Sequence, residues 1–256
     1  MTAEHSGAGK RVIVLGALSA IGEATARLYA GEGAHLVLAG RSAERLQQVA
    51  SDLGTRGAAS TKVWPVDLAT ATDPAGEFGR MARALGGPVD AVLVFYGVLG
   101  DQKRAETDAA EAWSIIATNF TSAAQWCLAA AALLEQQNAG VLVAVSSVAG
   151  DRGRQSNYVY GSAKAGLTVL VEGIAHRLAK GKARAVVVKL GFVATPMTAG
   201  MNRSGPLWAT PDAVARRIKA EAEHGRKPIV YIPWFWRGIM LAVRNVPVAI
   251  FHKTKL

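Results

Sequence analysis

Three residues of this chain have the types and spacing for proton transfer to a carbonyl group. Tyr160 and Lys164 are four residues apart, so a helix places them on one face, one turn from each other. Ser147 follows an apolar run, 141–145, that predicts a buried strand. A fixed ammonium beside a phenol favours the phenolate and lowers its pKa from the usual value of about 10. The tyrosine can then act as acid or base, while the serine hydroxyl holds the substrate oxygen.

The beginning of the chain has the pattern of a nucleotide-binding strand, turn and helix. The run 12–15 predicts the first strand, and a helix is expected to reach about residue 30. Glycines in the turn between them let backbone amides approach a pyrophosphate at the N-terminus of the helix. We therefore expect cofactor contacts from five residues of this turn: Gly16, Leu18, Ser19, Ile21 and Gly22.

Further apolar runs predict the other strands of a parallel sheet, at 35–39, 63–66, 91–95 and 185–190. Together with the intervening helices they predict an α/β fold, a Rossmann-like doubly wound parallel sheet in a single domain with a C-terminal amphipathic helix. With 256 residues, half of them hydrophobic, the chain can bury a sizeable core. We expect three segments: a flexible N-terminus (1–9), an NADP-binding catalytic domain (10–230) and a basic, aromatic C-terminal segment (231–256).

Over about residues 10–200 the chain resembles the short-chain dehydrogenase/reductase family, on its Ser and Tyr-x-x-x-Lys core and its nucleotide-binding turn. The resemblance implies an oxidoreductase with four catalytic residues: Asn119, Ser147, Tyr160 and Lys164. Asn119 lies in a predicted helix, 111–137, and matches the family's asparagine that holds a water against the catalytic lysine; the alternative is an ordinary exposed asparagine. The resemblance also assigns cofactor contacts to Asp67, Leu68, Gly97, Tyr160, Lys164 and Thr195.

The chain departs from the family pattern at three positions. Ala20 replaces the middle glycine of the turn, and Leu190 stands where proline is usual. Tyr96 occupies the place of an asparagine that braces the central sheet. These departures would fit a non-catalytic NADPH-binding scaffold, whereas the four intact catalytic residues favour an enzyme.

The end of the second predicted strand bears on the choice of cofactor. An acidic residue there would accept hydrogen bonds from the ribose hydroxyls of NAD, but this chain has Gly40 and Arg41. A guanidinium can pair with a 2′-phosphate, so Arg41 predicts NADPH/NADP as the cofactor. The alternative is a solvated arginine at the start of a helix.

The last forty residues are basic and aromatic. From residue 216 onward there are nine Lys or Arg and two Glu, a net charge of +7 out of +10 for the chain. Apolar residues from Trp236 to Val246 recur at helical spacing, with Arg237 and Arg244 on another face, and Pro233 and Pro247 would bound the helix. Such a helix suits a membrane interface, or packing on the core or on a partner subunit of a homo-oligomer, and the two options stay open. No nucleic-acid-reading element accompanies it, so we expect no nucleic acid partner.

Within the family, the segments 146–160 and 233–255 resemble the decaprenylphosphoryl-2-keto-ribose reductases. This implies NADPH-dependent reduction of a ketone on a polyprenyl-phosphate-linked pentose, in the synthesis of an arabinose donor. The alternatives are a reductase of another apolar ketone, acyl or steroid-like, and the scaffold mentioned above. Residues 196–215 are expected to form the substrate lid, because this region of the fold varies and carries specificity.

Composition limits the remaining options. A single cysteine, Cys127, allows no intrachain disulfide and no cysteine-based metal cluster, and we expect no metal site. The N-terminus has no apolar stretch typical of a secretory signal, and no run is long and apolar enough to span a membrane. These features predict a cytoplasmic protein, with peripheral contact at the inner face of the membrane as the option that the C-terminal segment adds.

Overall fold

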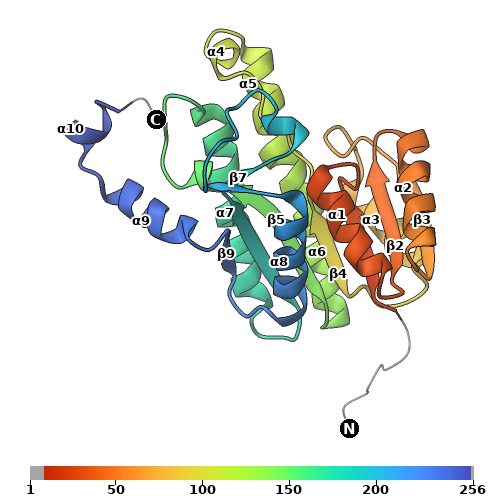
Figure 1. The fold of residues 1–256 in the computed structure, drawn as a ribbon. Coiled ribbons are helices and arrows are strands. Elements are labelled where there is room, and N and C mark those ends of the chain that lie inside the picture. The colour runs from red at the N-terminus through yellow and green to blue at the C-terminus, as the bar shows by residue number, and fades with distance from the viewer. Residues whose placement is uncertain (1–8, 255–256) are drawn as a thin grey trace.

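Six predicted apolar runs and one strand that was not predicted, β9, form a seven-stranded parallel sheet in the computed structural model, which describes residues 9–254 (Figure 1). The strands lie in the order β3-β2-β1-β4-β5-β6-β9. Their bounds are Arg11–Leu15 (β1), His35–Gly40 (β2), Ser60–Pro65 (β3), Ala91–Val94 (β4), Val141–Ser147 (β5), Arg184–Leu190 (β6) and Ile229–Ile232 (β9). The expected flexible N-terminus, 1–9, lies outside the described residues except for Gly9.

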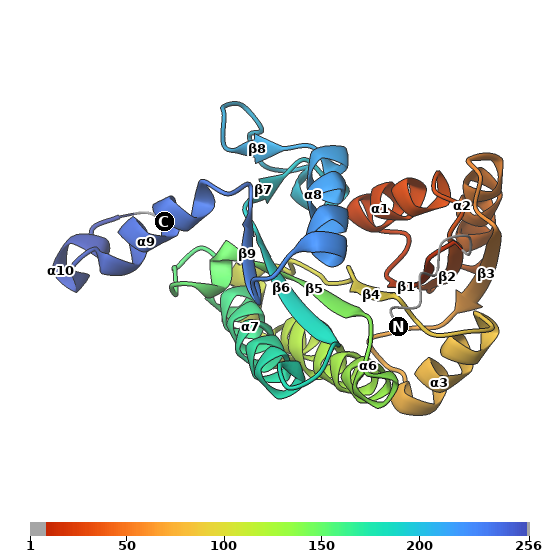
Figure 2. The ribbon, with the colours of Figure 1, turned by 90° about the horizontal axis from the view of Figure 1, so that it is seen from below.

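Both faces of the sheet are covered by helices (Figure 2). One face carries α1 (Ala20–Ala30), α2 (Ala43–Thr55) and α8 (Pro211–His224). The other carries α3 (Pro74–Ala84), α6 (Ala123–Gln137) and α7 (Tyr158–Leu178). Strands buried on both faces read as nearly continuous runs of Val, Ile and Leu, which is why the apolar runs predicted them. The predicted doubly wound α/β fold is confirmed.

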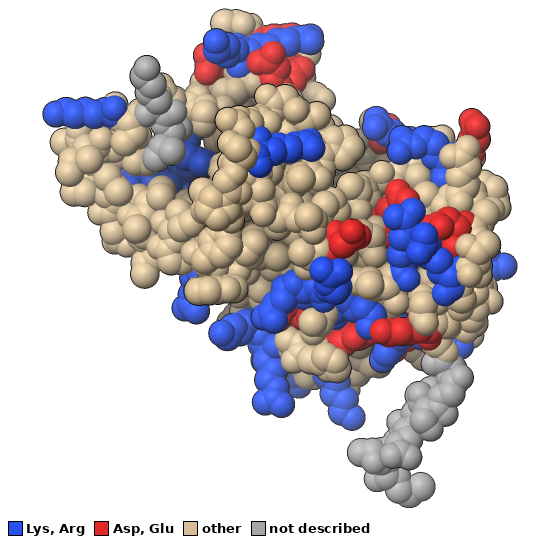
Figure 3. Space-filling view, viewed as in Figure 1, with Lys and Arg blue, Asp and Glu red and all other residues tan. Residues whose placement is uncertain are grey.

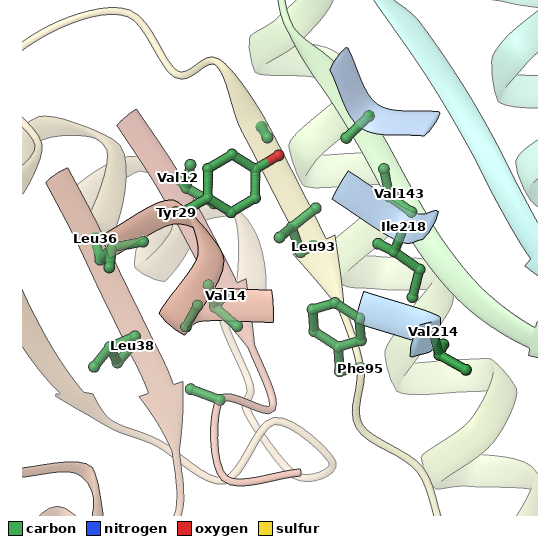
Figure 4. Close-up of a cluster of buried hydrophobic side chains, with 14 of the residues drawn as sticks. Val12, Val14, Tyr29, Leu36, Leu38, Leu93, Phe95, Val143, Val214 and Ile218 are labelled. Atoms are coloured by element: carbon green, nitrogen blue, oxygen red, sulfur yellow. The ribbon is translucent and has the colours of Figure 1, made fainter. Parts of the chain in front are cut away.

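The core has two layers, one on each side of the sheet. Figure 4 shows part of the layer under α1 and α8, where Tyr29 lies beside Val12 and Leu36 of β1 and β2, and Ile218 lies beside Val143 of β5. Because β1 and β4 are neighbours while β2 and β3 lie on the far side of β1, the direction of winding reverses between them. Ligands of such folds bind at the carboxyl ends of the strands at this reversal.

Two predicted elements differ from the structure. The run 63–66 predicts the third strand too late, because β3 starts at Ser60, where it pairs with His35 of β2. This edge strand is only partly buried, so its polar residues do not stand out as a strand. The helix expected over 111–137 is α5 (Ala109–Ile116), a π-helical stretch (Ala117–Ser122) and α6 in succession. Wider π-helical turns often mark functional positions, and this one contains Asn119.

The C-terminal segment leaves the sheet through β9, which runs across the expected boundary at residue 230. It continues as α9 (Trp236–Asn245) and α10 (Val248–Phe251), which extend away from the body of the protein (Figures 1 and 2). Trp236 and Met240 of α9 are buried against Val148, so this apolar face packs on the core. The opposite face leaves Trp234 81% and Leu241 65% exposed. Within the described residues, none of the helices has the length and hydropathy needed to cross a bilayer.

Several short elements surround the carboxyl ends of the strands. They are α4 (Gln102–Ala105), the 3-10 turns Val148–Gly150 and Pro196–Thr198, and the two-stranded ribbon of β7 (Phe192–Val193) and β8 (Trp208–Ala209). They connect the carboxyl ends of β4, β5 and β6 to the helices that follow, and they form the walls of the site described next.

Candidate active site

A cavity of about 480 Å³ opens at the carboxyl ends of the central strands. All four predicted catalytic residues line it: Asn119, Ser147, Tyr160 and Lys164. Most of the predicted cofactor contacts line it as well: Leu18, Ser19, Ile21, Arg41, Gly97 and Thr195. Residues separated by nearly 180 positions are thus brought to one place, which is where this topology predicts a ligand.

The strand β5 and the helix α7 hold the Ser, Tyr and Lys residues together. Ser147 is the last residue of β5, and Tyr160 and Lys164 lie in the first two turns of α7. The neighbouring Ser146 hydroxyl donates to the Lys164 carbonyl at 2.9 Å and lies 2.8 Å from the Thr168 hydroxyl. These buried contacts fix α7 against the end of β5. The backbone therefore sets the positions of Ser147, Tyr160 and Lys164 relative to one another.

Burial has the largest effect on the pKa values of Tyr160 and Lys164. It raises the pKa of Tyr160 to about 12, although the Ser147 hydroxyl acts in the opposite direction. Burial also lowers the pKa of Lys164 to about 8. The Lys164 ammonium donates to the Val145 carbonyl at 3.1 Å and lies 5.8 Å from the centre of the Tyr160 ring. The lowered tyrosine pKa expected from a neighbouring ammonium is therefore not the net result here, because desolvation raises the pKa more than the Ser147 hydroxyl lowers it.

Asn119 is fully buried and connects the π-helical stretch to the end of β4. Its amide nitrogen donates to the Val98 carbonyl at 2.7 Å and to the Ile115 carbonyl at 2.9 Å, and its oxygen accepts from the Val98 amide at 3.2 Å. The alternative interpretation as an ordinary exposed asparagine is wrong. A side chain on Gly97 would come within 2.6 Å of the Asn119 oxygen, so glycine is needed for this close approach.

The turn after β1 fits a dinucleotide pyrophosphate. Gly16 has a φ of +85°, and an added Cβ would lie 2.7 Å from the Tyr96 amide nitrogen. The Ser19 hydroxyl caps α1 by accepting from the Gly22 amide at 3.0 Å. A tight turn that ends at the N-terminus of a helix presents backbone amides to an anion. Ala20 is the first residue of α1, and its methyl group leaves this turn intact.

The adenosine end of the cavity is basic. Arg41 lines it together with Arg45 of α2, which the sequence analysis missed. The signal was available, because Arg45 follows Arg41 by only four residues at the end of the second predicted strand. Asp67 and Leu68 do not line this cavity: Asp67 accepts from the Ala69 amide at 3.0 Å, and Leu68 is buried. Their cofactor contacts stay a prediction.

The opposite end of the cavity is apolar and was not predicted from sequence. Leu99, Phe192 and Met201 line it, and they also line an adjoining cavity of about 340 Å³. The expected lid, 196–215, consists of the 3-10 turn Pro196–Thr198, an exposed loop, the strand β8 and the start of α8 at Pro211. Phe192 lies edge-on to Trp236 at 5.2 Å between ring centres, so the C-terminal segment supports this wall.

The departures from the family pattern are accommodated by packing. The Tyr96 hydroxyl is 2.9 Å from the Ser122 hydroxyl, which joins the end of β4 to the π-helical stretch. Leu190 is buried at the end of β6. A methyl group on Gly191 would overlap the indole of Trp236, so glycine is required beside it.

A doubly wound sheet with a dinucleotide-binding turn and a Ser-Tyr-Lys group at its switch point defines a nicotinamide-dependent oxidoreductase. The family model described as short chain dehydrogenase matches residues 10–205. The chain therefore belongs to the short-chain dehydrogenase family, whose members use NAD or NADP.

Individual relatives agree with this assignment. An uncharacterized oxidoreductase of Mycobacterium tuberculosis (strain H37Rv) is 38% identical over 239 residues, covering 92% of this chain and 93% of the relative. An uncharacterized oxidoreductase of Streptomyces coelicolor is 36% identical over 254 residues, covering 99% of both chains. A solved structure described as a short chain dehydrogenase/reductase family protein superimposes with a TM-score of 0.76 at 27% identity, covering 88% of this chain and 95% of the other.

Proposed function

We propose that the protein is an NADPH-dependent carbonyl reductase, and that its substrate is a ketone on a polyprenyl-phosphate-linked pentose. The observation that carries the reductase chemistry is the convergence of Ser147, Tyr160 and Lys164 in one cavity with the dinucleotide-binding turn. Membership of the short-chain dehydrogenase family and the similarity to a relative named an uncharacterized oxidoreductase support the same class of reaction.

In this reaction the bound nicotinamide supplies a hydride to the carbonyl carbon. Tyr160 donates its hydroxyl proton to the carbonyl oxygen, and a pKa of about 12 keeps that proton in place at neutral pH. The Ser147 hydroxyl holds the same oxygen, and the Lys164 ammonium stabilises the phenolate that the proton transfer leaves behind. Asn119 fixes the segment at Val98 against the helix, which keeps the floor of the cavity in position.

The preference for NADPH is supported by charge at the adenosine end. Arg41 and Arg45 line the cavity there. The residue that directly follows β2 is Arg41 itself and not an acidic residue. A guanidinium matches a 2′-phosphate in geometry and charge, whereas the ribose diol of NAD would call for a carboxylate.

The lipid-linked pentose is supported by the mixed character of the substrate end. Leu99, Phe192 and Met201 offer apolar contacts, and Arg154 adds a positive charge beside them. Another apolar ketone, acyl or steroid-like, would use the same apolar wall but would have no need of the arginine.

The test is NADPH oxidation by the purified protein against a panel of ketones, followed at 340 nm. The panel contains a polyprenyl-phosphoryl 2-keto-pentose, its short-chain analogue, a 3-ketoacyl thioester and a 3-ketosteroid. We expect the highest kcat/KM with the lipid-phosphate-linked ketone. A higher value with the thioester or the steroid would assign the enzyme to that substrate class, and binding of NADPH without turnover of any ketone would favour the scaffold.

We also propose that the outer face of the C-terminal segment rests on an anionic membrane surface, where a polyprenyl substrate resides. Its exposed apolar residues are Trp234, Leu241, Val248 and Ile250, with Arg237 and Arg244 exposed on α9 beside them. Figure 3 shows a largely uncharged surface in the region of α9 and α10. Apolar side chains that enter the headgroup layer and basic ones that stay in water are typical of such contacts.

Sedimentation with vesicles containing anionic lipid tests this contact. Truncation after Ile232 would also remove the buried Trp236, so the double substitution Trp234→Ser and Leu241→Ser is the cleaner variant. We expect it to lose binding at low salt and to keep NADPH binding. Its activity should fall more on the long-chain than on the short-chain substrate. Equal sedimentation of the variant and the wild type would contradict the membrane proposal.

A further inference from the structure

The loop between β5 and α7 carries three charged residues, and two of them make hydrogen bonds or ion pairs with other parts of the protein. Asp151 is paired with Lys189 and accepts a hydrogen bond from the Tyr231 hydroxyl at 2.8 Å. Arg152 donates to the Val246 carbonyl at 2.8 Å and lies 3.7 Å from the centre of the Phe251 ring. These contacts fasten the loop to β6, β9 and the C-terminal segment.

Arg154, the third charged residue of the loop, has no such partner. Its Nε is buried and makes no hydrogen bond, and it forms no ion pair with an acidic side chain of residues 9–254. Burial lowers the pKa of Arg154, and only Asp151 acts in the opposite direction. Since Lys189 and Tyr231 already occupy Asp151, the guanidinium is left as a partly buried charge without compensation.

Asn157 is a second polar group that the fold leaves unsatisfied. It occupies the N-cap position of α7, where an asparagine side chain normally accepts from a backbone amide, but its side chain makes no such bond. Its Oδ1 is buried without a hydrogen-bond partner. A buried acceptor and a buried donor, Arg154 Nε, thus lie three residues apart in one loop, both unused.

Both residues face the substrate end of the active site. Arg154, Asn157 and Tyr160 line the main cavity and also the adjoining cavity of about 340 Å³. The apolar part of that second cavity is formed by Leu99, Phe192 and Met201. A ketone whose carbonyl oxygen is at Tyr160 would therefore extend its neighbouring substituents toward Arg154 and Asn157.

We propose that Arg154 and Asn157 form a subsite for a phosphate ester next to a hydroxyl group on the ketone substrate. The phosphate oxygens accept from the Arg154 guanidinium, including its Nε, and the hydroxyl donates to Asn157 Oδ1. One ligand thereby satisfies both unpartnered groups. The proposal rests on the proposed reductase function, because it places this subsite beside the carbonyl that Tyr160 protonates.

Dihydroxyacetone phosphate and dihydroxyacetone form a matched pair of probes. They share a carbonyl and a neighbouring hydroxyl, and they differ by a phosphate on the carbon next to the carbonyl. Binding of each to the NADP-loaded protein is measured by titration calorimetry or ligand-observed NMR, so that no turnover is needed. We expect the wild type to bind the phosphate ester about tenfold or more tightly than the neutral ketone, as a charge-assisted contact predicts.

Three variants test whether Arg154 and Asn157 form the proposed subsite. Arg154→Met should abolish the preference for the phosphate ester and leave binding of dihydroxyacetone and NADPH unchanged. Asn157→Leu removes the acceptor for the hydroxyl and should weaken binding of both probes, because both carry that hydroxyl. Lys103→Met is the control, because it removes an exposed charge beside Gln102, which lines the second cavity, without touching the subsite.

The outcomes separate this proposal from the reductase assignment. Equal binding of the two probes to the wild type, or equal loss in Arg154→Met and Lys103→Met, would overturn the subsite. If Asn157→Leu bound both probes as tightly as the wild type, the role of Asn157 would be wrong even where Arg154→Met failed to fold. If the binding preference were present but no ketone oxidised NADPH, the subsite would stand and the reductase function would fall.

Discussion

The cofactor end and the substrate end of the active-site cavity differ in how far the protein satisfies its own polar groups. At the cofactor end, Ser19 caps α1, and at the catalytic centre between the two ends the Asn119 amide makes three hydrogen bonds with backbone groups. At the substrate end, Arg154 and Asn157 each keep a buried atom without a partner. Exposed methionines also gather there, at positions 197 and 201.

This difference indicates where specificity lies. A site whose hydrogen bonds are complete before binding is preorganised, and it serves a cofactor common to a whole family. A site that leaves donors and acceptors open favours the one ligand that completes them, because an unpaired buried group is costly.

Tyr160→Phe removes the proton donor at the junction of the two ends. We expect kcat to fall by about 10²- to 10⁴-fold, since general acid catalysis contributes that much, while NADPH binding is retained. NADPH fluorescence titration and steady-state kinetics check both parts. Tyr158→Phe, on an exposed side chain two residues earlier, should behave as the wild type. Turnover above about half of the wild-type rate in Tyr160→Phe would rule out the mechanism.

Trp236→Ala removes the support under the substrate end. The indole is buried and packs on Phe192, so we expect the free energy of unfolding to fall by about 3–5 kcal/mol. Trp234→Ala, two residues earlier, should change it by less than about 0.5 kcal/mol because that side chain is exposed. Urea unfolding monitored by circular dichroism compares the two. Similar losses would mean that the two faces of α9 do not differ as described.

Arg41→Ala acts on the cofactor end alone. The side chain is exposed, so solvent weakens its contact with a 2′-phosphate, and we expect the Kd for NADPH to rise about five- to tenfold. The Kd for NADH should stay the same, because that cofactor has no phosphate there. Arg56→Ala, on an arginine at the far end of α2 and outside the cavity, serves as the control. A wild type that binds NADH more tightly than NADPH would refute the proposed preference.

The rate of ketone reduction should depend on pH because Lys164 loses its proton in the measured range, whereas Tyr160 does not. The Lys164 pKa of about 8 means that the ammonium loses its proton as the pH rises through 8, while Tyr160, with a pKa of about 12, stays protonated. We expect kcat/KM at pH 8 to be about half of its value at pH 6.5 and to fall further above that. The same shift makes folding less favourable below pH 8, and this penalty disappears as the pH rises from 8 to 10.5. A flat profile up to pH 10 would contradict the assignment.

The sequence alone determined the parts of the protein that depend on local pattern. Apolar runs predicted the central strands because strands of a parallel sheet are buried on both faces, and Tyr160 and Lys164 were placed on one helix face by their spacing. The edge strand β3 was misplaced because half-burial leaves little pattern to read. Helical spacing likewise revealed that α9 has an apolar face.

The partner that each of these surfaces contacts is known only from the tertiary structure. The apolar face of α9 was compatible with lipid, core or a partner, and the contact of Trp236 and Met240 with Val148 assigned it to the core. The net direction of the Tyr160 pKa also depended on burial, which no spacing of residues specifies. Arg154 and Asn157 became notable only because folding buries one atom of each without a partner, and the absence of a partner is a property of the whole fold rather than of any segment.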